Sequence, residues 1–84
     1  MDSPYGVAAI QLRPTPDRDR NLQAAAELID EAAGLGAELV VLPEIFSAPF
    51  VAAEVDPTYF SWAEALDGPS NAVVAERSAA HGIT

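Results

Sequence analysis

Blocks of apolar residues at two different spacings predict a strand, a helix and a second strand in the first half of the chain. Residues 5–12 are mostly apolar and predict an interior β-strand. From about residue 18 to residue 35, apolar side chains such as Leu22 and Ile29 recur on one helix face, with acidic residues opposite. Residues 38–42 predict a second strand, whose uninterrupted apolar run is typical of burial on both faces. This order predicts a βαβ unit with parallel strands.

The ends of these elements carry signals of their own. Asp17 is a candidate N-cap, with Asp19 as the alternative, because a carboxylate there accepts hydrogen bonds from the unpaired N–H groups of the first helical turn. Gly34 and Gly36 are candidate C-cap positions, since glycine readily adopts the left-handed backbone that ends many helices. Pro43 has no backbone N–H, so it ends the second strand and leaves Glu44 at its carboxyl end.

The second half of the chain is less regular. The stretch 45–67 holds two prolines and most of the aromatic residues, and its pattern predicts no long element. Pro69 suits the first turn of a second helix that continues to His81, and Gly82 follows as the residue that ends it. Residues 83–84 then predict the opening of a third strand.

The composition limits the core that this chain can build. Half of its 84 residues are hydrophobic, but many are alanines, which bury little surface each. We therefore expect the isolated chain to lack a self-sufficient core. Thirteen acidic residues outweigh four arginines and give a net charge of -9. That charge argues against nucleic-acid partners and against anionic membrane surfaces.

Several kinds of site are excluded by residue types that the chain lacks. It has no cysteine, so neither a disulfide framework nor a thiolate metal site can form. His81 is the only histidine, which also excludes a histidine-rich metal cluster, and its place in the last helical turn favours a structural role. The sequence shows no basic leader and no apolar stretch of membrane-spanning length, so a cytoplasmic protein is expected.

Glu44 is the strongest candidate for chemistry. In open α/β sheets, ligands bind outside the carboxyl ends of the strands, and Pro43 leaves this carboxylate there. A single carboxylate can act as a general base, bind a metal or pair with a cation, and position alone does not choose among these roles. A solvated carboxylate without a function is the competing interpretation. The serines offer no alternative, because none lies in the Gly-x-Ser-x-Gly context of an activated nucleophile.

Five stretches of the sequence together resemble the N-terminal segment of the carbon–nitrogen hydrolase (nitrilase) superfamily. They are residues 7–12, 19–22, 32–44, 66–70 and 79–83, so the resemblance spans nearly the whole chain. The most specific stretch is Leu-Val-Val-Leu-Pro-Glu, which ends at Glu44 and follows a glycine-closed helix.

This resemblance implies a fold and a mechanism. The fold is an α/β, four-layer α-β-β-α sandwich, of which the chain would be the N-terminal βαβ-α portion, truncated before or within the third strand. Residues 1–84 would then be an N-terminal fragment of a single hydrolase domain. The mechanism uses a Glu-Lys-Cys triad without cofactor or metal, in which Glu44 matches the general base. The chain has neither lysine nor cysteine, so by itself it is predicted to be inactive.

The resemblance also indicates a branch of the superfamily. The stretches 46–51 and 62–64 look most like those of the amidases and N-carbamoyl-amine hydrolases. The expected substrate of the intact protein is therefore a small-molecule amide or carbamoyl compound, and Phe50 is a candidate for lining its pocket. Family members commonly form homo-oligomers, so a homo-oligomer is expected for the intact protein.

Two other functions compete with this interpretation. The chain, taken as it stands, can be a catalytically silent α/β fragment or interaction module. A phosphate-binding or nucleotide-binding α/β domain is a weaker alternative, because no glycine-rich turn follows the first strand and Gly34 and Gly36 precede a strand instead of opening a helix. A lysine and a cysteine encoded further downstream would favour the enzyme.

Overall fold

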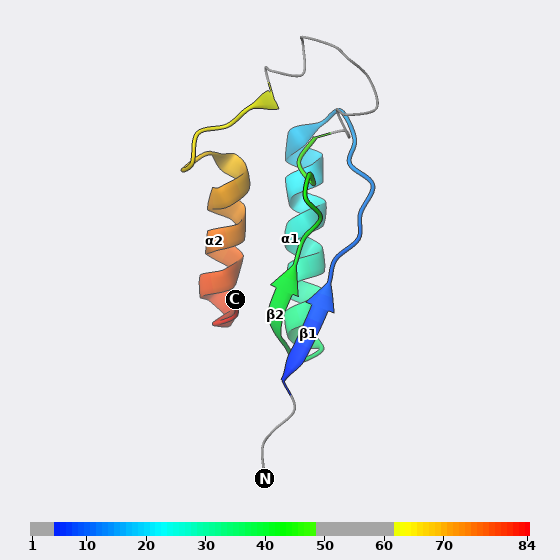
Figure 1. Ribbon diagram of the computed structural model, residues 1–84, viewed down its shortest axis with the longest axis vertical. Helices are drawn as coiled ribbons and strands as arrows, with labels where there is room; N and C mark the ends of the chain where they lie inside the picture. Colours follow the sequence, from blue (N-terminus) through cyan, green and yellow to red (C-terminus); the bar gives the residue numbers. More distant parts are fainter. Residues whose placement is uncertain (1–4, 49–61) are drawn as a thin grey trace.

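Two short parallel strands and two helices make up the part of the chain that the computed structural model describes, residues 5–48 and 62–84. They are β1 (Gly6–Ala9), α1 (Arg18–Gly34), β2 (Ala37–Val41) and α2 (Pro69–His81). β1 pairs with β2 in parallel, α1 packs against β2, and α2 lies beside α1 (Figure 1). The structure thus confirms the predicted α/β class and the βαβ unit followed by a helix. Neither described helix has the length and apolarity needed to cross a bilayer.

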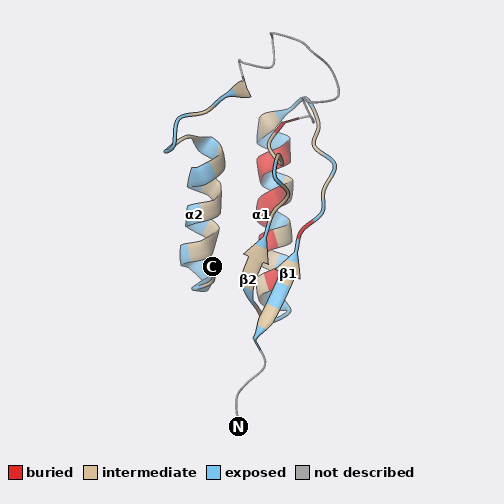
Figure 2. Cartoon of the chain, viewed as in Figure 1, coloured by how far each residue is buried: buried red, intermediate tan, exposed pale blue. Residues whose placement is uncertain are grey.

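Most of the buried surface belongs to α1. Its buried apolar side chains include Leu22 and Ile29, and Ile10, just after β1, is buried against it (Figure 2). The other buried apolar residues of the described part are all alanines, namely Ala25, Ala26, Ala32 and Ala48. In contrast, α2 has no buried residue. The core is therefore thin, as the alanine-rich composition predicts.

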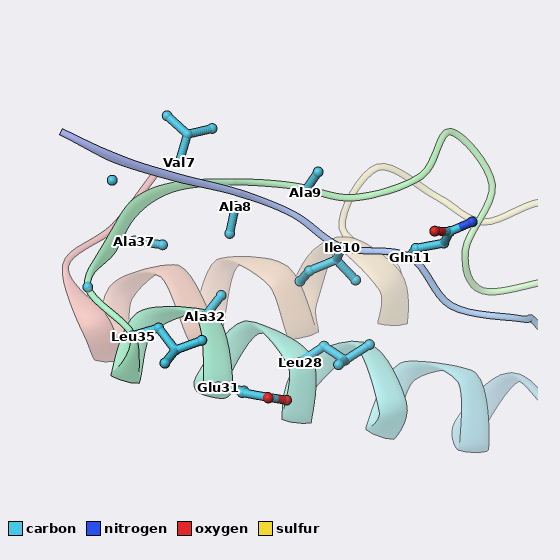
Figure 3. A pocket seen from close by; sticks show the side chains of 12 residues that line it. Val7, Ala8, Ala9, Ile10, Gln11, Leu28, Glu31, Ala32, Leu35 and Ala37 are labelled. Atoms are coloured by element: carbon cyan, nitrogen blue, oxygen red, sulfur yellow. The ribbon is translucent and has the colours of Figure 1, made fainter.

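Within residues 5–48 and 62–84, only one face of the two-stranded sheet is covered. Side chains along β1 alternate, so that Ala8 and Ile10 point toward α1 while Val7 and Ala9 point away from it (Figure 3). Val7 is 62% exposed, and Val41 on β2, the partner of Ala9 in the register, is 50% exposed. The prediction that the second strand is buried on both faces is thus wrong for the described part of the chain, because no described element covers the second face.

The ends of α1 follow the sequence signals with one shift. The Asp17 side chain accepts a hydrogen bond from the backbone N–H of Arg20 at 3.2 Å, which confirms it as the N-cap. At the other end the C-cap is Leu35, and Gly36 supplies the left-handed backbone, with a φ of 97°. Gly6 is required for a different reason, since a Cβ there would lie 2.5 Å from the carbonyl oxygen of Gly36. The backbone of the turn between α1 and β2 is therefore in close contact with the start of β1.

The last two residues begin a new strand beside β2. The backbone N–H of Thr84 donates to the carbonyl of Glu38 at 3.0 Å, and the N–H of Val40 donates to the carbonyl of Thr84 at 2.9 Å. These are the two bonds that a parallel neighbour makes. Thr84 lies two residues after Gly82, which ends α2 as predicted and has a left-handed backbone with a φ of 63°. The two bonds agree with the expected opening of a third strand, while the assigned sheet consists of β1 and β2.

We expect the isolated 84-residue chain to unfold without a sharp cooperative transition. Its core depends on a few large side chains of one helix, and one face of its sheet is exposed. The free energy gained by burying so little apolar surface does not offset the conformational entropy that the backbone loses on folding. Far-UV circular dichroism during heating is the measurement. A steep transition that does not depend on protein concentration would contradict this expectation.

Candidate functional site

Glu44 lies on the loop that leaves the carboxyl end of β2, and its side chain is exposed. The carboxylate borders an open groove of about 460 Å³. The groove is lined by the loop 44–47, by the segment 64–66 and by Ser70 and Asn71 in the first turn of α2. Glu44 thus lies at the edge of the sheet, as predicted, and at the mouth of a groove between two segments that are distant in the sequence.

A second carboxylate, Glu64, lines the same groove and is largely buried, with 13% of its side chain exposed. It accepts hydrogen bonds from the backbone N–H and the hydroxyl of Ser70, at 2.7 and 2.5 Å. The hydroxyl of Ser47 donates to it at 3.4 Å, and the Arg18 guanidinium lies 3.7 Å away. Glu64 therefore connects the Glu44 loop, the start of α2 and the start of α1.

The surroundings of Glu64 keep it ionised. Partial burial alone would raise the pKa of the Glu64 carboxyl, but the hydrogen bonds from Ser70, the charge of Arg18 and the bond from Ser47 outweigh it and hold this pKa below its ordinary value. A carboxylate with a lowered pKa whose oxygens already accept several hydrogen bonds is a poor proton acceptor. Within residues 5–48 and 62–84, in contrast, the Glu44 side chain has no hydrogen-bond partner or ion pair. The two carboxylates of the groove thus differ, since Glu64 is held by several hydrogen bonds and Glu44 by none within the described residues.

Arg18 is itself held in place by Trp62. Its Nη2 donates to the backbone carbonyl of Trp62 at 2.5 Å, and its guanidinium carbon lies 5.2 Å from the centre of the Trp62 ring. That distance is within the range of a cation–π interaction. The positive charge beside Glu64 is therefore fixed by the segment that leads into α2.

Sequence reasoning did not single out Glu64. The signal that points to Glu64 is the start of α2. The N-cap residue there is Gly68, which has no side chain to accept hydrogen bonds from the first backbone N–H groups of the helix. A carboxylate close before such a helix start is a candidate to replace the missing cap, and Glu64 does so through Ser70. Phe50, the predicted pocket residue, lies outside the described residues.

Two other candidate features do not contribute to this site. A hollow of about 450 Å³ runs between β1 and the C-terminal half of α1, and Glu31 is its only ionisable lining residue (Figure 3). In the described ranges, no group of three or more histidine, aspartate or glutamate side chains is arranged to hold a metal ion. The groove beside Glu44 is thus the place where the described residues bring ionisable groups together at the sheet edge.

His81 joins the two helices. Its Nε2 lies 2.7 Å from Oδ1 of Asp30 on α1, and the Arg77 guanidinium lies 3.3 Å from the other Asp30 oxygen. The hydrogen bond with His81 lowers the pKa of Asp30, burial raises it, and the charges of Arg77 and His81 lower it, so that the pKa lies below its ordinary value. The predicted structural role of His81 at the helix end therefore includes an interhelical contact.

This contact is expected to make the packing of α2 on α1 depend on pH. Because the native pKa of Asp30 lies below its ordinary value of 3.8, the pair stabilises the fold above that pH, and the stabilisation is lost as the pH falls through the native pKa. Circular dichroism of the wild type and Asp30→Asn between about pH 2 and pH 6 tests it. The helical signals should differ at the upper end and converge at the lower end. Glu27→Gln, on the exposed side of α1, is the control, and an equal response in both variants would contradict the assignment.

The sequence of the chain matches one family model over nearly its whole length. The sequence model of the family described as carbon-nitrogen hydrolase matches residues 6–84. The chain is 38% identical to the chloroplastic omega-amidase of Arabidopsis thaliana, over 95% of this chain and 22% of that protein. It is 36% identical to an omega-amidase of Danio rerio, over 96% of this chain and 28% of that protein.

A third relative is similar over a shorter range. The chain is 54% identical to a deaminated glutathione amidase of a Synechocystis strain, over 52% of this chain and 16% of that protein. The chain spans about a quarter of the length of the omega-amidases that it matches. No solved structure shows a significant similarity to it.

Proposed function

Because the chain belongs to the carbon-nitrogen hydrolase family, we propose that it supplies the general base, Glu44, of an enzyme that hydrolyses small-molecule amides. The observation that carries this proposal is the exposed Glu44 carboxylate, at the carboxyl edge of the sheet and without a partner among the described residues. A base must have an accessible oxygen with which to take a proton, and Glu44 has one.

The proposed chemistry needs a nucleophile and an oxyanion-stabilising group that this chain does not contain. In a Glu-Lys-Cys triad, Glu44 takes the thiol proton, and the thiolate attacks the amide carbon to form a tetrahedral adduct that the lysine stabilises. The C–N bond then breaks, and the departing amine receives the proton from Glu44. In the second half, Glu44 takes a proton from water, which attacks the thioester and releases the acid and the thiol.

We also propose that residues 1–84 are the N-terminal part of one hydrolase domain. The omega-amidases of Arabidopsis thaliana and Danio rerio are about four times longer than the region matched here. The exposed second face of the sheet is consistent with further layers of such a domain packing on it. The missing lysine and cysteine would then come from the remainder.

An amide is favoured over an N-carbamoyl amine as the substrate. Both carry a C–N bond next to a carbonyl, and both fit the proposed triad. The relatives reported above, however, are named omega-amidase and deaminated glutathione amidase. We therefore propose a small amide for this protein as well.

A catalytically silent module is the second candidate function, and the absence of lysine and cysteine from the 84 residues favours it for the chain alone. The two candidates separate in one experiment. The coding sequence is read past the codon of Thr84, and the polypeptide translated from the whole reading frame, called the complete gene product below, is purified. Its release of ammonia from a panel of small amides and N-carbamoyl amines is then measured. A frame that ends at Thr84, or a longer product that releases no ammonia from any of them, would overturn the enzymatic proposal.

A further inference from the structure

Asn21 is the one polar side chain of the described residues that is fully buried, with 2% of its surface exposed. Its amide nitrogen donates to the backbone carbonyls of Thr15 and Ser47, at 2.7 and 3.0 Å. Its amide oxygen accepts from the backbone N–H and the hydroxyl of Thr15, at 2.7 and 2.9 Å. A primary amide offers two N–H donors and two acceptor lone pairs, so every one of them is used.

These partners also fix which end of the amide is the nitrogen. The carbonyls of Thr15 and Ser47 can only accept, and the N–H of Thr15 can only donate. Asparagine therefore satisfies all four bonds in a single orientation. An aspartate of the same shape would keep both bonds from Thr15 and, when ionised, lose the bonds to both carbonyls.

The amide joins the two loops at the carboxyl edge of the sheet. Thr15 belongs to the loop that follows β1, and Ser47 belongs to the loop that follows β2. Asn21 stands between them in the first turns of α1. The loop that carries Glu44 is thus hydrogen-bonded through Ser47 to α1, the helix that holds most of the buried residues.

The other side of Ser47 is held by Glu64. The Ser47 hydroxyl donates to Glu64, and Glu64 is fixed by Ser70 and by the nearby charge of Arg18. The structure gives Glu44 itself no comparable hydrogen bond within the described ranges. The described hydrogen bonds that hold its loop are those at Ser47, three residues away.

We propose that Asn21 is a positioning residue for Glu44, which acts by anchoring Ser47 so that the strand-end loop holds the carboxylate at the groove. This inference rests on the proposed function. A base contributes fully only when it is held in the reacting geometry, and a displacement of about 1 Å can cost about a hundredfold in rate. The buried amide provides such a constraint without touching the substrate.

The test compares Asn21→Asp with Thr15→Val in the complete gene product. Asn21→Asp retains the bonds from Thr15 but releases Ser47, and we expect kcat for ammonia release to fall at least about tenfold while KM changes less than about twofold. Thr15→Val removes one bond to the same amide and leaves Ser47 anchored, so kcat should stay within about twofold. Ser47→Ala removes only the bond to Glu64, and a fall in kcat of about threefold with unchanged KM is expected.

The outcomes separate this inference from the proposed function. If Glu44→Gln keeps full activity, the proposed function itself fails. If Glu44→Gln is inactive while folded Asn21→Asp keeps kcat, the positioning role of Asn21 fails. The inference would also be overturned if Asn21→Asp and Thr15→Val lowered kcat equally and the loss followed the folded fraction measured by circular dichroism. Asn21 would then have a purely structural role. Should Asn21→Asp not fold, Asn21→Ala decides, because it also removes the bond to the Ser47 carbonyl and introduces no buried charge. A folded Asn21→Ala that keeps kcat within about twofold would overturn the inference.

Discussion

Glu44→Gln is expected to reduce kcat of the complete gene product by about a hundredfold to ten-thousandfold, the usual contribution of a general base. Glutamine has nearly the same shape as glutamate but cannot take a proton from a thiol or from water. The exposed position of Glu44 means that this change removes no described hydrogen bond, so the fold should be unaffected. The measurement is ammonia release at saturating amide, with circular dichroism to confirm the fold.

The matched control for this prediction is Glu38→Gln. Glu38 is also an exposed carboxylate, but it lies within β2, at the opposite end of the strand from the groove. Its replacement should leave kcat within about twofold, since a surface substitution away from a site has little effect. Equal activity of both variants and the wild type would remove Glu44 from the mechanism. An equal loss in both would point to a general effect of surface charge.

Leu22→Ala is expected to destabilise the packing of α1 by about 2–5 kcal/mol, as large-to-small changes in protein cores do. Leu22 is 6% exposed and is one of the few large side chains in the described core. Its truncation removes apolar burial and leaves a cavity, and neighbouring alanines are too small to fill that space. Urea denaturation of the complete gene product, followed by far-UV circular dichroism, measures the change.

Leu35→Ala is the control, because it makes the same chemical change at a residue that is 83% exposed. The free energy of unfolding should change by about 0.5 kcal/mol or less. Leu35 is the C-cap residue of α1, and its backbone N–H bonds to preceding carbonyls do not depend on the side chain. Similar destabilisation by both variants would mean that a further layer of the protein covers Leu35.

The two carboxylates of the groove have different surroundings, and this difference supports the different roles that we propose for them. Glu64 is surrounded by donors from Ser47 and Ser70 and by the charge of Arg18, so it stays ionised and holds the groove together. Glu44 faces solvent at the mouth of the same groove. A site that needs one fixed anion and one proton acceptor can obtain both from glutamates by placing them in such different environments.

The sequence by itself determined the order of elements and the position of Glu44. The helix spacing of Leu22 and Ile29, the cap at Asp17 and the stop at Pro43 are local signals, because each depends on residues within one or two turns of backbone. They predicted α1, β2 and the strand-end carboxylate close to where the structure has them. The same signals predicted Gly82 as the end of α2.

The tertiary structure alone decided what surrounds that carboxylate. Asn21 meets Ser47 across 26 residues of sequence, and His81 meets Asp30 across 51 residues, so no local pattern records either contact. Whether the second strand is covered on one face or on two also depends on which elements pack against it and not on its own apolar run. Periodicity and capping are encoded between neighbours along the chain, whereas the hydrogen bonds that join the Glu44 loop at Ser47 to Asn21 and Glu64 form only when separate segments are brought together by packing.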